Sequence, residues 1–352
     1  MATKHTQAWQ IDEAEFKDLH ELKEKIVFFV RYAILAPSPW NSQPWKFKVD
    51  GNRLELYADP DRKQENRDPE CREQLVSCGA ALANAVIAAK HFGFKCTVQY
   101  CPAGVPEDCV GIIDFAESDS EDPCAPSPEE IELNERLFKA IPERRSYRQD
   151  FQDRPISDDI SRELQDTAAA FGVEFVPLPS YSTKLALAGL VAEGDWYLEA
   201  DQATRDEYAS WIRSNENKGD GVPGYALGMG KVASMLAPVT HRLFDYTAEH
   251  AHKDSKLTSS TALIGVFAVP QDDRANWVLG GAAMQHVLLH ATARGIQASF
   301  LNQPIPVPEL RQRLSDLLGR SDTPISIVRL GHPNEGEIKP TPRLPVEDML
   351  ID

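Results

Sequence analysis

The sequence predicts an α+β protein built from two similar halves, because a strand-like run and a helix each occur twice in the same order. The stretch CGAALANAVIAAKHFGF at 78–94 matches GGAAMQHVLLHATARGI at 280–296. Upstream of each, LELYADPD at 54–61 resembles IGVFAVPQ at 264–271, a strand-like run that stops at proline. Two matches in one order favour internal duplication and a fused pseudo-dimer.

Both repeated helices are predicted to be buried and closely packed. A constant shift of 202 residues (281 minus 79) superposes Gly79 on Gly281. Each stretch places apolar residues at helical spacing with small residues between them, and each ends at a glycine, the usual left-handed stop of a helix. We therefore expect the helices at 78–93 and 280–295 to join the two halves.

A linker is expected between the halves. The stretch ESDSEDPCAPSPEE at 117–130 is acidic and rich in proline and serine, which is typical of exposed linkers. It divides the chain into a lobe at 1–125 and a lobe at 126–352 that ends in an arm from 333. The second lobe carries an extra segment at about 196–256, whose glycine-rich part, WIRSNENKGDGVPGYALGMGK, predicts a mobile loop of the kind that forms lids.

Composition excludes several classes of function. The chain has 352 residues, 42% of them hydrophobic and 26% charged, which is enough to bury a sizeable core. Its 37 basic and 54 acidic residues give a net charge of -17, which repels nucleic acids and anionic lipid. The most apolar early run, at 26–36, contains Arg31 and is too short to span a bilayer. We expect a cytoplasmic protein without nucleic-acid or membrane partners.

The cysteines and histidines do not predict a metal site. The six cysteines form no CxxC pair and have no nearby histidine, so reduced structural thiols are expected. His286 and His290 have the i, i+4 spacing of a zinc pair, but the glutamate of HExxH is absent and packed histidines are favoured. The six cysteines are Cys71, Cys78, Cys96, Cys101, Cys109 and Cys124.

The run GMGKVA at 228–233 imitates a nucleotide-binding loop. No hydrophobic strand leads into it, and a phosphate-binding P-loop would require Gly at position 225 and Ser or Thr at position 232, where this chain has Tyr and Val. A turn is the favoured interpretation.

The stretch APSPWNSQPW at 36–45 interrupts a helical pattern. Pro37 disfavours helix at the residue before it, so the preceding helix should end there. Ser38 followed by Pro39 is the N-cap and first position of a new short helix, which would aim its amides outward.

The polar residues of this stretch form a candidate binding cluster. Ser38, Asn41 and Gln43 could hydrogen-bond the edge of a flat heterocycle, with Trp40 or Trp45 available for apolar contact. The alternative is a tight turn between helices.

Arginines gather at the start of the second half. IPERRSYRQDF contains Arg144, Arg145 and Arg148, and arginine is the side chain suited to bidentate phosphate binding. Arg343 lies in the proline-stiffened tail KPTPRLPVEDM, which could reach across the other half. The alternatives are a solvated basic face paired with carboxylates, and an ordinary exposed tail charge.

Together these motifs resemble a known family. ERRSYR is similar to the Arg-Arg-Ser-x-Arg motif of the FMN-dependent nitroreductases, APSPWNSQPW to their APSxxNxQPW motif, and the repeated helices to their central dimer helices. The likeness runs from about residue 20 to the end and is strongest to the fused two-lobe, Acg-type members. It implies a nitroreductase-like fold with mixed sheets flanked by helices, and one FMN site made across the seam.

The resemblance also implies site residues. Residues of the arginine motif and Arg343 would bind the phosphate and ribityl oxygens, and residues of the opening stretch would meet the flavin from the opposite half. Where the family often has a glycine facing the flavin N5, this chain has Leu301, Asn302 and Gln303, which leaves that contact open. The full predicted set is Pro37, Ser38, Asn41, Gln43, Arg144, Arg145, Ser146, Arg148, Leu301, Asn302, Gln303 and Arg343.

The implied activity is a ping-pong transfer of hydride from NAD(P)H through FMN to a nitroaromatic, quinone or similar acceptor. Because the flavin carries this chemistry, no catalytic residue of the protein is required. The alternative is an FMN-binding or storage protein whose lid closes the flavin face. Since the fusion supplies the dimer seam internally, we expect a monomer.

Overall fold

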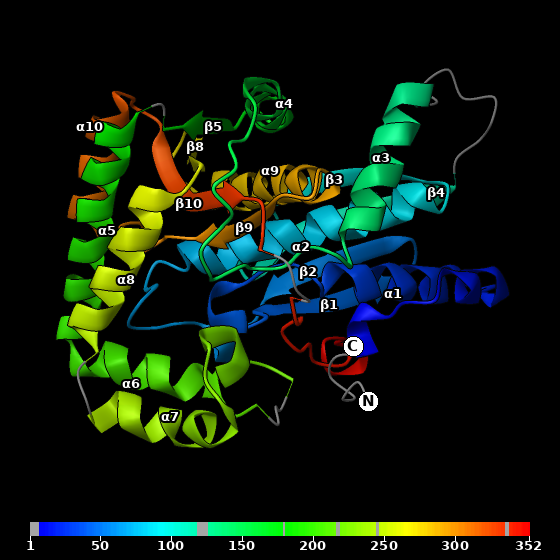
Figure 1. The fold of residues 1–352 in the computed structure, drawn as a ribbon. Helices are drawn as coiled ribbons and strands as arrows, with labels where there is room; N and C mark the ends of the chain where they lie inside the picture. Colours follow the sequence, from blue (N-terminus) through cyan, green and yellow to red (C-terminus); the bar gives the residue numbers. More distant parts are fainter. Residues whose placement is uncertain (1–6, 118–125, 179, 216–218, 244–245, 335–337) are drawn as a thin grey trace.

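The computed structural model describes residues 7–117, 126–178, 180–215, 219–243, 246–334 and 338–352. Two four-stranded sheets lie on either side of a central pair of long helices, and a group of helices from the second half extends to one side (Figure 1). The described part is therefore an α+β protein, as predicted. None of its helices combines the length and apolar character needed to cross a lipid bilayer.

The two sheets share one order of strands. The first runs β1-β2-β4-β3 and the second β5-β8-β10-β9, and neighbouring strands in both are antiparallel. The order β2-β4-β3 in one sheet thus matches β8-β10-β9 in the other. The strands are β1 (Trp45–Asp50), β2 (Arg53–Ala58), β3 (Phe94–Tyr100), β4 (Cys109–Glu117), β5 (Glu174–Pro177), β8 (Leu263–Val269), β9 (Gln297–Phe300) and β10 (Thr323–Gly331).

The resemblance implied mixed sheets, and parallel pairing enters the two described sheets through isolated bridges at their edges. Phe47 of β1 pairs with Leu350 of the C-terminal arm, and Ser146 pairs with Ala298 of β9. A separate short parallel pair joins β6 (Ile212–Arg213) to β7 (Val222–Pro223).

The helices account for most of the remaining chain. The α-helices are α1 (Leu22–Ala33), α2 (Arg72–His91), α3 (Pro128–Ala140), α4 (Asp158–Ala169), α5 (Tyr181–Ala200), α6 (Gln202–Trp211), α7 (Lys231–Leu243), α8 (Thr247–Ser260), α9 (Arg274–Ala293) and α10 (Pro308–Leu318). The short 3-10 helices are η1 (Gln7–Trp9), η2 (Glu13–Asp18), η3 (Pro39–Asn41), η4 (Pro60–Arg62), η5 (Gly224–Leu227) and η6 (Val346–Asp348).

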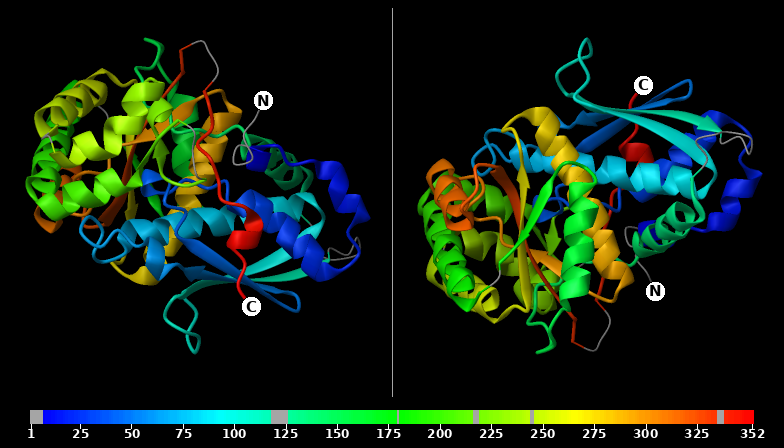
Figure 2. Two further views of the ribbon diagram at one scale, coloured as in Figure 1. Left: turned by 90° about the horizontal axis from the view of Figure 1, so that it is seen from below. Right: turned by 90° about the horizontal axis from the view of Figure 1, so that it is seen from above.

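The seam between the halves is formed by α2 and α9, which lie against each other in the middle of the molecule (Figures 1 and 2). A Cβ atom built on Gly79 would lie 1.8 Å from the carbonyl oxygen of Val278, and one built on Gly281 would lie 2.0 Å from that of Val76. Val278 follows Val76 by the same 202 residues (278 minus 76) that separate the two glycines. The contacts are therefore reciprocal, as a twofold relation between the helices requires.

Polar contacts also cross the seam. The Gln285 amide donates to Asn84 Oδ1 at 2.7 Å, and Asn84 in turn donates to the Tyr32 carbonyl at 3.0 Å. Arg72 of α2 pairs with Asp272, and its guanidinium lies 4.1 Å from the ring centre of Trp277. These polar pairs add directional contacts to the apolar packing of the seam.

The insert at 196–256 is mostly helical. It consists of the end of α5, then α6, α7 and α8, and its glycines gather in the β6–β7 connection and in the turn before α7. Leu187 and Val191 of α5 belong to an apolar cluster with Ile264 and Ile327 of the second sheet. The glycine-rich part, for which a loop was predicted, forms this short connection and turn between α6 and α7. Its mobility and its role as a lid stay predictions.

The C-terminal arm crosses to the first half, where Figure 2 shows it beside the first sheet. The Phe47 amide donates to the Met349 carbonyl at 2.8 Å, and the Ile351 amide donates to the Phe47 carbonyl at 2.9 Å. The predicted reach of this tail across the other half is confirmed. Of the predicted linker, residues 118–125, including Cys124, lie outside the described residues, and Ser127 caps α3. The other five cysteines are free thiols.

Replacing Gly79 or Gly281 by alanine should destabilise the protein strongly. The added methyl group would overlap a backbone carbonyl, so the helices must separate, at a cost of about 3 kcal/mol at the upper end of overpacking. Chemical denaturation would measure this loss in the free energy of unfolding. Gly189→Ala on α5 is the matched control, because nothing lies within 4 Å of its Cβ position. Equal stability of the three variants would contradict the assignment.

Candidate functional site

A cavity of about 700 Å³ lies where the two halves and the insert meet. This volume is within the range of about 300–1,000 Å³ that small-molecule sites occupy. Its wall combines the turn after α1, the segments that follow α3 and β9, and the helices α5 to α8. A ligand here would contact both halves at once.

Seven of the predicted residues line this cavity. Ser38 comes from the first half and Ser146 from the second, so the two motifs face a common space across the seam. The seven are Pro37, Ser38, Ser146, Arg148, Leu301, Asn302 and Gln303. The other five do not line it: Asn41, Gln43, Arg144, Arg145 and Arg343 serve the scaffold behind the wall.

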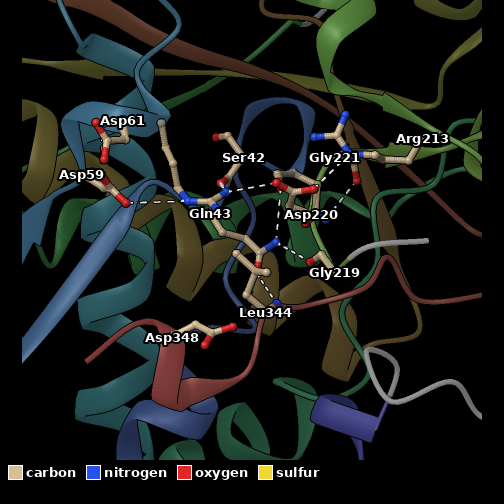
Figure 3. Close-up of polar contacts among 12 residues, drawn as sticks. Ser42, Gln43, Asp59, Asp61, Arg213, Gly219, Asp220, Gly221, Leu344 and Asp348 are labelled. Carbon is tan, nitrogen blue, oxygen red and sulfur yellow. Dashed lines mark hydrogen bonds and ion pairs between the residues drawn. The ribbon is translucent and has the colours of Figure 1, made fainter. Parts of the chain in front are cut away.

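Gln43 holds two distant segments together instead of facing the cavity (Figure 3). Its side-chain nitrogen donates to the Gly219 carbonyl at 2.9 Å, and its side-chain oxygen accepts from the Leu344 amide at 2.9 Å. Gln43 is fully buried. Both polar atoms of its side chain therefore form hydrogen bonds that join the opening turn to the insert and to the C-terminal arm.

Asn41 makes the same kind of connection. Its side-chain nitrogen donates to the carbonyls of Gly221 at 3.1 Å and Pro342 at 3.0 Å, and its side-chain oxygen accepts from Arg343 at 2.7 Å. The expected flavin contacts of Asn41 and Gln43 are thus not supported. We call the pair, with the backbone groups it binds, the Asn41–Gln43 clasp.

An ion network lies beside the clasp (Figure 3). Asp220 pairs with Arg213 at 3.0 Å and with Arg62 at 3.3 Å, and Arg62 also donates to the Ser42 carbonyl at 2.8 Å. These contacts tie the β6–β7 connection to the first half a second time. The insert is therefore anchored at its glycine-bearing end.

The turn that carries the clasp has a strained backbone. Trp40, Asn41 and Gln43 have φ values of 49°, 56° and 52°, the left-handed region that non-glycine residues rarely adopt. The short helix starts at Pro39 as predicted, but the Ser38 hydroxyl accepts from the Gln43 amide at 2.9 Å and does not cap the helix. Such strain costs about 1–3 kcal/mol per residue and persists where surrounding contacts over-determine it, as the clasp does.

Trp40 lines the cavity beside Pro37, Ser38 and Pro39 and is the aromatic side chain of this turn. Its ring centre lies 5.2 Å from that of Tyr208 on α6, and the guanidinium of Arg67 lies 5.2 Å from it. The strained turn thus presents an aromatic surface that packs against the insert.

Arg343 stabilises the end of α1. Its guanidinium donates to the carbonyls of Ile34 at 2.6 Å, Leu35 at 3.1 Å and Ala36 at 3.0 Å, in addition to Asn41. Only 2% of its surface is exposed, and burial lowers the pKa of the guanidinium, helped by the neighbouring arginines. A cation on the last carbonyls of a helix is favourable. The proposed phosphate contact of Arg343 is therefore not supported.

Arg144 and Arg145 lie close to Arg343. Arg144 and Arg343 share the Leu35 carbonyl, and Arg145 and Arg343 share the ring of Trp9. Arg144 donates to the Leu35 carbonyl at 3.3 Å, and burial lowers its pKa to about 9, with Arg145 and Arg148 adding to the effect. Arg145 donates to the Pro142 carbonyl at 2.7 Å and stacks 4.2 Å from the ring centre of Trp9. Neither side chain lines the cavity.

Arg148 is the arginine of the motif that faces the cavity. It makes no hydrogen bond or ion pair with any other residue that the structure describes, and burial lowers the pKa of its guanidinium. The side chain is half-buried, so its guanidinium remains open to the cavity. Arg148 is therefore available to bind an anion.

Arg329 is a second cavity cation, which sequence reasoning missed. It is 1% exposed and donates to the carbonyls of Tyr147 and Gln149, both at 3.0 Å. Burial lowers its pKa to about 10. The signal was available in TPISIVRLG, because an arginine inside an apolar strand is rarely buried without a reason.

The segment after β9 offers few free polar groups. The Leu301 amide donates to Ile327, and the Asn302 side chain accepts from the Ile327 amide at 2.8 Å and donates to Glu73 at 2.7 Å. The Gln303 side-chain nitrogen donates to Asp254 on α8 at 2.5 Å. These residues line the cavity, but their side-chain donors are already used.

The insert contributes titratable side chains that sequence reasoning also missed. Asp195 and Glu199 lie four residues apart on α5, and His250 and Asp254 four apart on α8, so each pair shares one helix face. His250 hydrogen-bonds Glu199 at 2.6 Å; burial opposes its charge, but Glu199 and the other carboxylates raise the pKa of His250 overall. The i, i+4 spacing of these acidic and histidine residues in the sequence could have predicted a titratable face on each helix.

The histidines of HVLLH are packed side chains. His286 Nδ1 lies 2.9 Å from the Ala282 carbonyl, and burial lowers its pKa to about 4, so the ring is neutral at pH 7. His290 lies 3.0 Å from the Thr167 hydroxyl. The described residues contain no group of three or more side chains suited to a metal ion.

Gln43→Ala should destabilise the protein by about 2 kcal/mol, because the Gly219 carbonyl and the Leu344 amide would lose buried partners. The free energy of unfolding from chemical denaturation would measure this loss. Gln99→Ala on the exposed face of β3 is the control, and the clasp would be disproved as a stabilising element if both variants unfolded alike.

Comparison with known proteins gives relatives over nearly the whole chain. No family model matches. "Putative NAD(P)H nitroreductase Rv3131" of Mycobacterium tuberculosis is 27% identical over 314 residues, which cover 88% of this chain and 86% of the relative. "Putative NAD(P)H nitroreductase acg" of the same organism is 28% identical over 332 residues, covering 91% and 93%. "Uncharacterized protein Rv3127" is 24% identical over 330 residues.

Superposition on solved structures is weaker. The FMN and NADPH-dependent nitroreductase NfnB from sphigopyxis sp. strain HMH is 16% identical and superposes on 61% of this chain and 97% of its own, with a TM-score of 0.42. That score is too low to support an argument, so the fold described above rests on the chain's own strands and helices. The sequence relatives confirm the predicted resemblance: this chain is similar, over 91% of its length, to a protein named as an Acg-type NAD(P)H nitroreductase.

Proposed function

We propose that the chain is an FMN-dependent NAD(P)H oxidoreductase of the nitroreductase type. The observation that carries the proposal is the cavity at the seam, which Ser38 from one half and Ser146 and Arg148 from the other line together. The names of the relatives support the same activity. A site that needs both halves also agrees with a chain that acts as its own pseudo-dimer and remains a monomer.

The residues present fit FMN. The ligand carries a phosphate dianion on a flat aromatic ring system, and the cavity offers Arg148 without a partner, a second cation in Arg329, and an aromatic face in Trp40. Apolar side chains such as Val222 and Met284 complete the wall. We assign the phosphate to Arg148 and Ser146, and the neighbourhood of the ring to Pro37 and Ser38.

When bound, FMN supplies reversible hydride transfer, and the protein supplies position, electrostatics and exclusion of water. The insert helices α5 to α8 form much of the wall and so limit access of solvent. NAD(P)H and an oxidised acceptor would use the cavity in turn, which is the structural basis of a ping-pong order.

Anaerobic mixing of the purified yellow protein with NADH or NADPH should bleach the flavin absorbance, because the cofactor then takes hydride. The stopped-flow rate would show which nucleotide is preferred. A persistent yellow colour with both nucleotides would contradict the oxidoreductase and favour FMN storage behind the insert, which walls the cavity.

Arg148→Ala should weaken FMN binding about 10- to 100-fold, since hydrogen bonds to charged groups contribute about 1.5–3 kcal/mol. Fluorescence titration of the FMN-free protein would give the dissociation constants. Arg313→Ala is the matched control, because Arg313 is exposed on α10 and pairs with Glu193 at 2.7 Å away from the cavity lining. Equal affinity of the two variants would remove the phosphate assignment.

A further inference from the structure

Asp195 is an acidic side chain of the cavity wall, and one of its carboxyl oxygens is unsatisfied. It lies on α5, its surface is 6% exposed, and its Oδ2 atom is buried without a hydrogen-bond partner. The residue lines the cavity, so its carboxyl group lies beside the space that a ligand would occupy. A buried polar atom in this state calls for an explanation.

The neighbouring carboxylates already have donors. Asp254 accepts from the Gln303 side chain at 2.5 Å, and Glu199 is hydrogen-bonded to His250 at 2.6 Å. Asp195 differs from both in that its Oδ2 atom is buried without a donor.

Charged and titratable groups approach this position from every packed element. Burial raises the pKa of Asp195 to about 8, and the charges of Asp254 and Glu199 add to the effect, against smaller opposing contributions from Gln303 and His250. Because the pKa is raised, the carboxyl is mostly protonated at pH 7 and loses its proton as the pH rises through 8. The charged and titratable groups that line the cavity with Asp195 are Arg67, Arg148 and Tyr246, together with Glu73 of α2, Glu199 of α5, Arg205 and Tyr208 of α6, His241 of α7, Glu249, His250, Lys253 and Asp254 of α8, and Arg329 of β10.

We propose that Asp195 is the proton donor to the electron acceptor, and that the acceptor is a molecule whose oxygen takes up a proton on reduction, as a quinone carbonyl does. This proposal rests on the proposed oxidoreductase function. It gives the insert a chemical role beyond covering the cavity, because α5 brings an acid to the ligand.

The reaction balances in atoms and electrons. NAD(P)H is oxidised to NAD(P)⁺ and yields one hydride, which carries two electrons and one proton. The quinone gains that hydride and one further proton to become the hydroquinone. The O–H bond of Asp195 breaks, an O–H bond forms on the quinone oxygen, and the Asp195 carboxylate regains a proton from water before the next turnover.

The test is Asp195→Asn, which keeps the shape of the side chain but cannot act as an acid. FMN binding and anaerobic reduction by NAD(P)H should stay close to wild type. Reoxidation by a quinone such as menadione should slow about 100-fold, the lower end of general acid catalysis. The wild-type reoxidation rate should fall above pH 8, and the variant should lack this fall.

Glu193→Gln is the matched control. It removes one carboxylate from the exposed side of the same helix, where Glu193 pairs with Arg313. Its reoxidation rate and pH profile should equal those of wild type. If this variant were slowed as much as Asp195→Asn, the loss of one negative charge would explain both results, and the proposal would be overturned.

A second measurement does not depend on turnover. In FMN-free protein labelled with ¹³C at aspartate carboxyls, NMR should show a carboxyl that titrates near pH 8 in wild type and is missing in Asp195→Asn. If that variant does not fold, two measurements on wild type test the proton transfer to the quinone. The rate of reoxidation should fall above pH 8, and below pH 8 it should show a solvent deuterium isotope effect.

The failures are distinguishable. If wild type is not reduced by NAD(P)H at all, the proposed function is wrong. If wild type is reduced but Asp195→Asn is reoxidised by the quinone at the wild-type rate, or if no aspartate titrates near pH 8, the proposal for Asp195 is overturned while the oxidoreductase stands.

Discussion

The close approach of α2 and α9 is the constraint on which the rest of this structure depends. Gly79 and Gly281 let the backbone of each helix touch the other, and no larger residue fits at either position. Because this contact sets how the two halves sit, it also sets where the turn after α1 meets the segment after α3. The cavity exists at the seam as a consequence of helix packing.

The most distinctive motif in the sequence builds the wall and does not supply most of the contacts to a ligand. Asn41 and Gln43 bind backbone groups of the insert and of the C-terminal arm, and Arg343 satisfies the carbonyls at the end of α1. These buried bonds hold a turn in a conformation that is otherwise unfavourable. The strain is useful because it keeps Ser38 and Trp40 on the cavity side.

The electrostatics of the cavity follow from the same exclusion of water. Arg148 and Arg329 come from the second half, and their pKa values fall because burial disfavours the charged form. Asp195 comes from α5 and Asp254 from α8, and burial raises their pKa values for the same reason. One cavity thus brings cations suited to an anionic ligand together with an acid that keeps its proton at pH 7.

The sequence alone determined the α+β class, the repeat, the central helices and the two motifs that meet at the seam, because periodicity, glycine spacing and proline positions are local properties of the chain. It also predicted that Ser38, Ser146 and Arg148 belong to one site. Only the tertiary structure decided that Asn41, Gln43 and Arg343 serve the scaffold, and that Asp195 and Arg329 face the cavity. Which buried groups a polar side chain satisfies depends on segments hundreds of residues away, and no local pattern encodes that pairing.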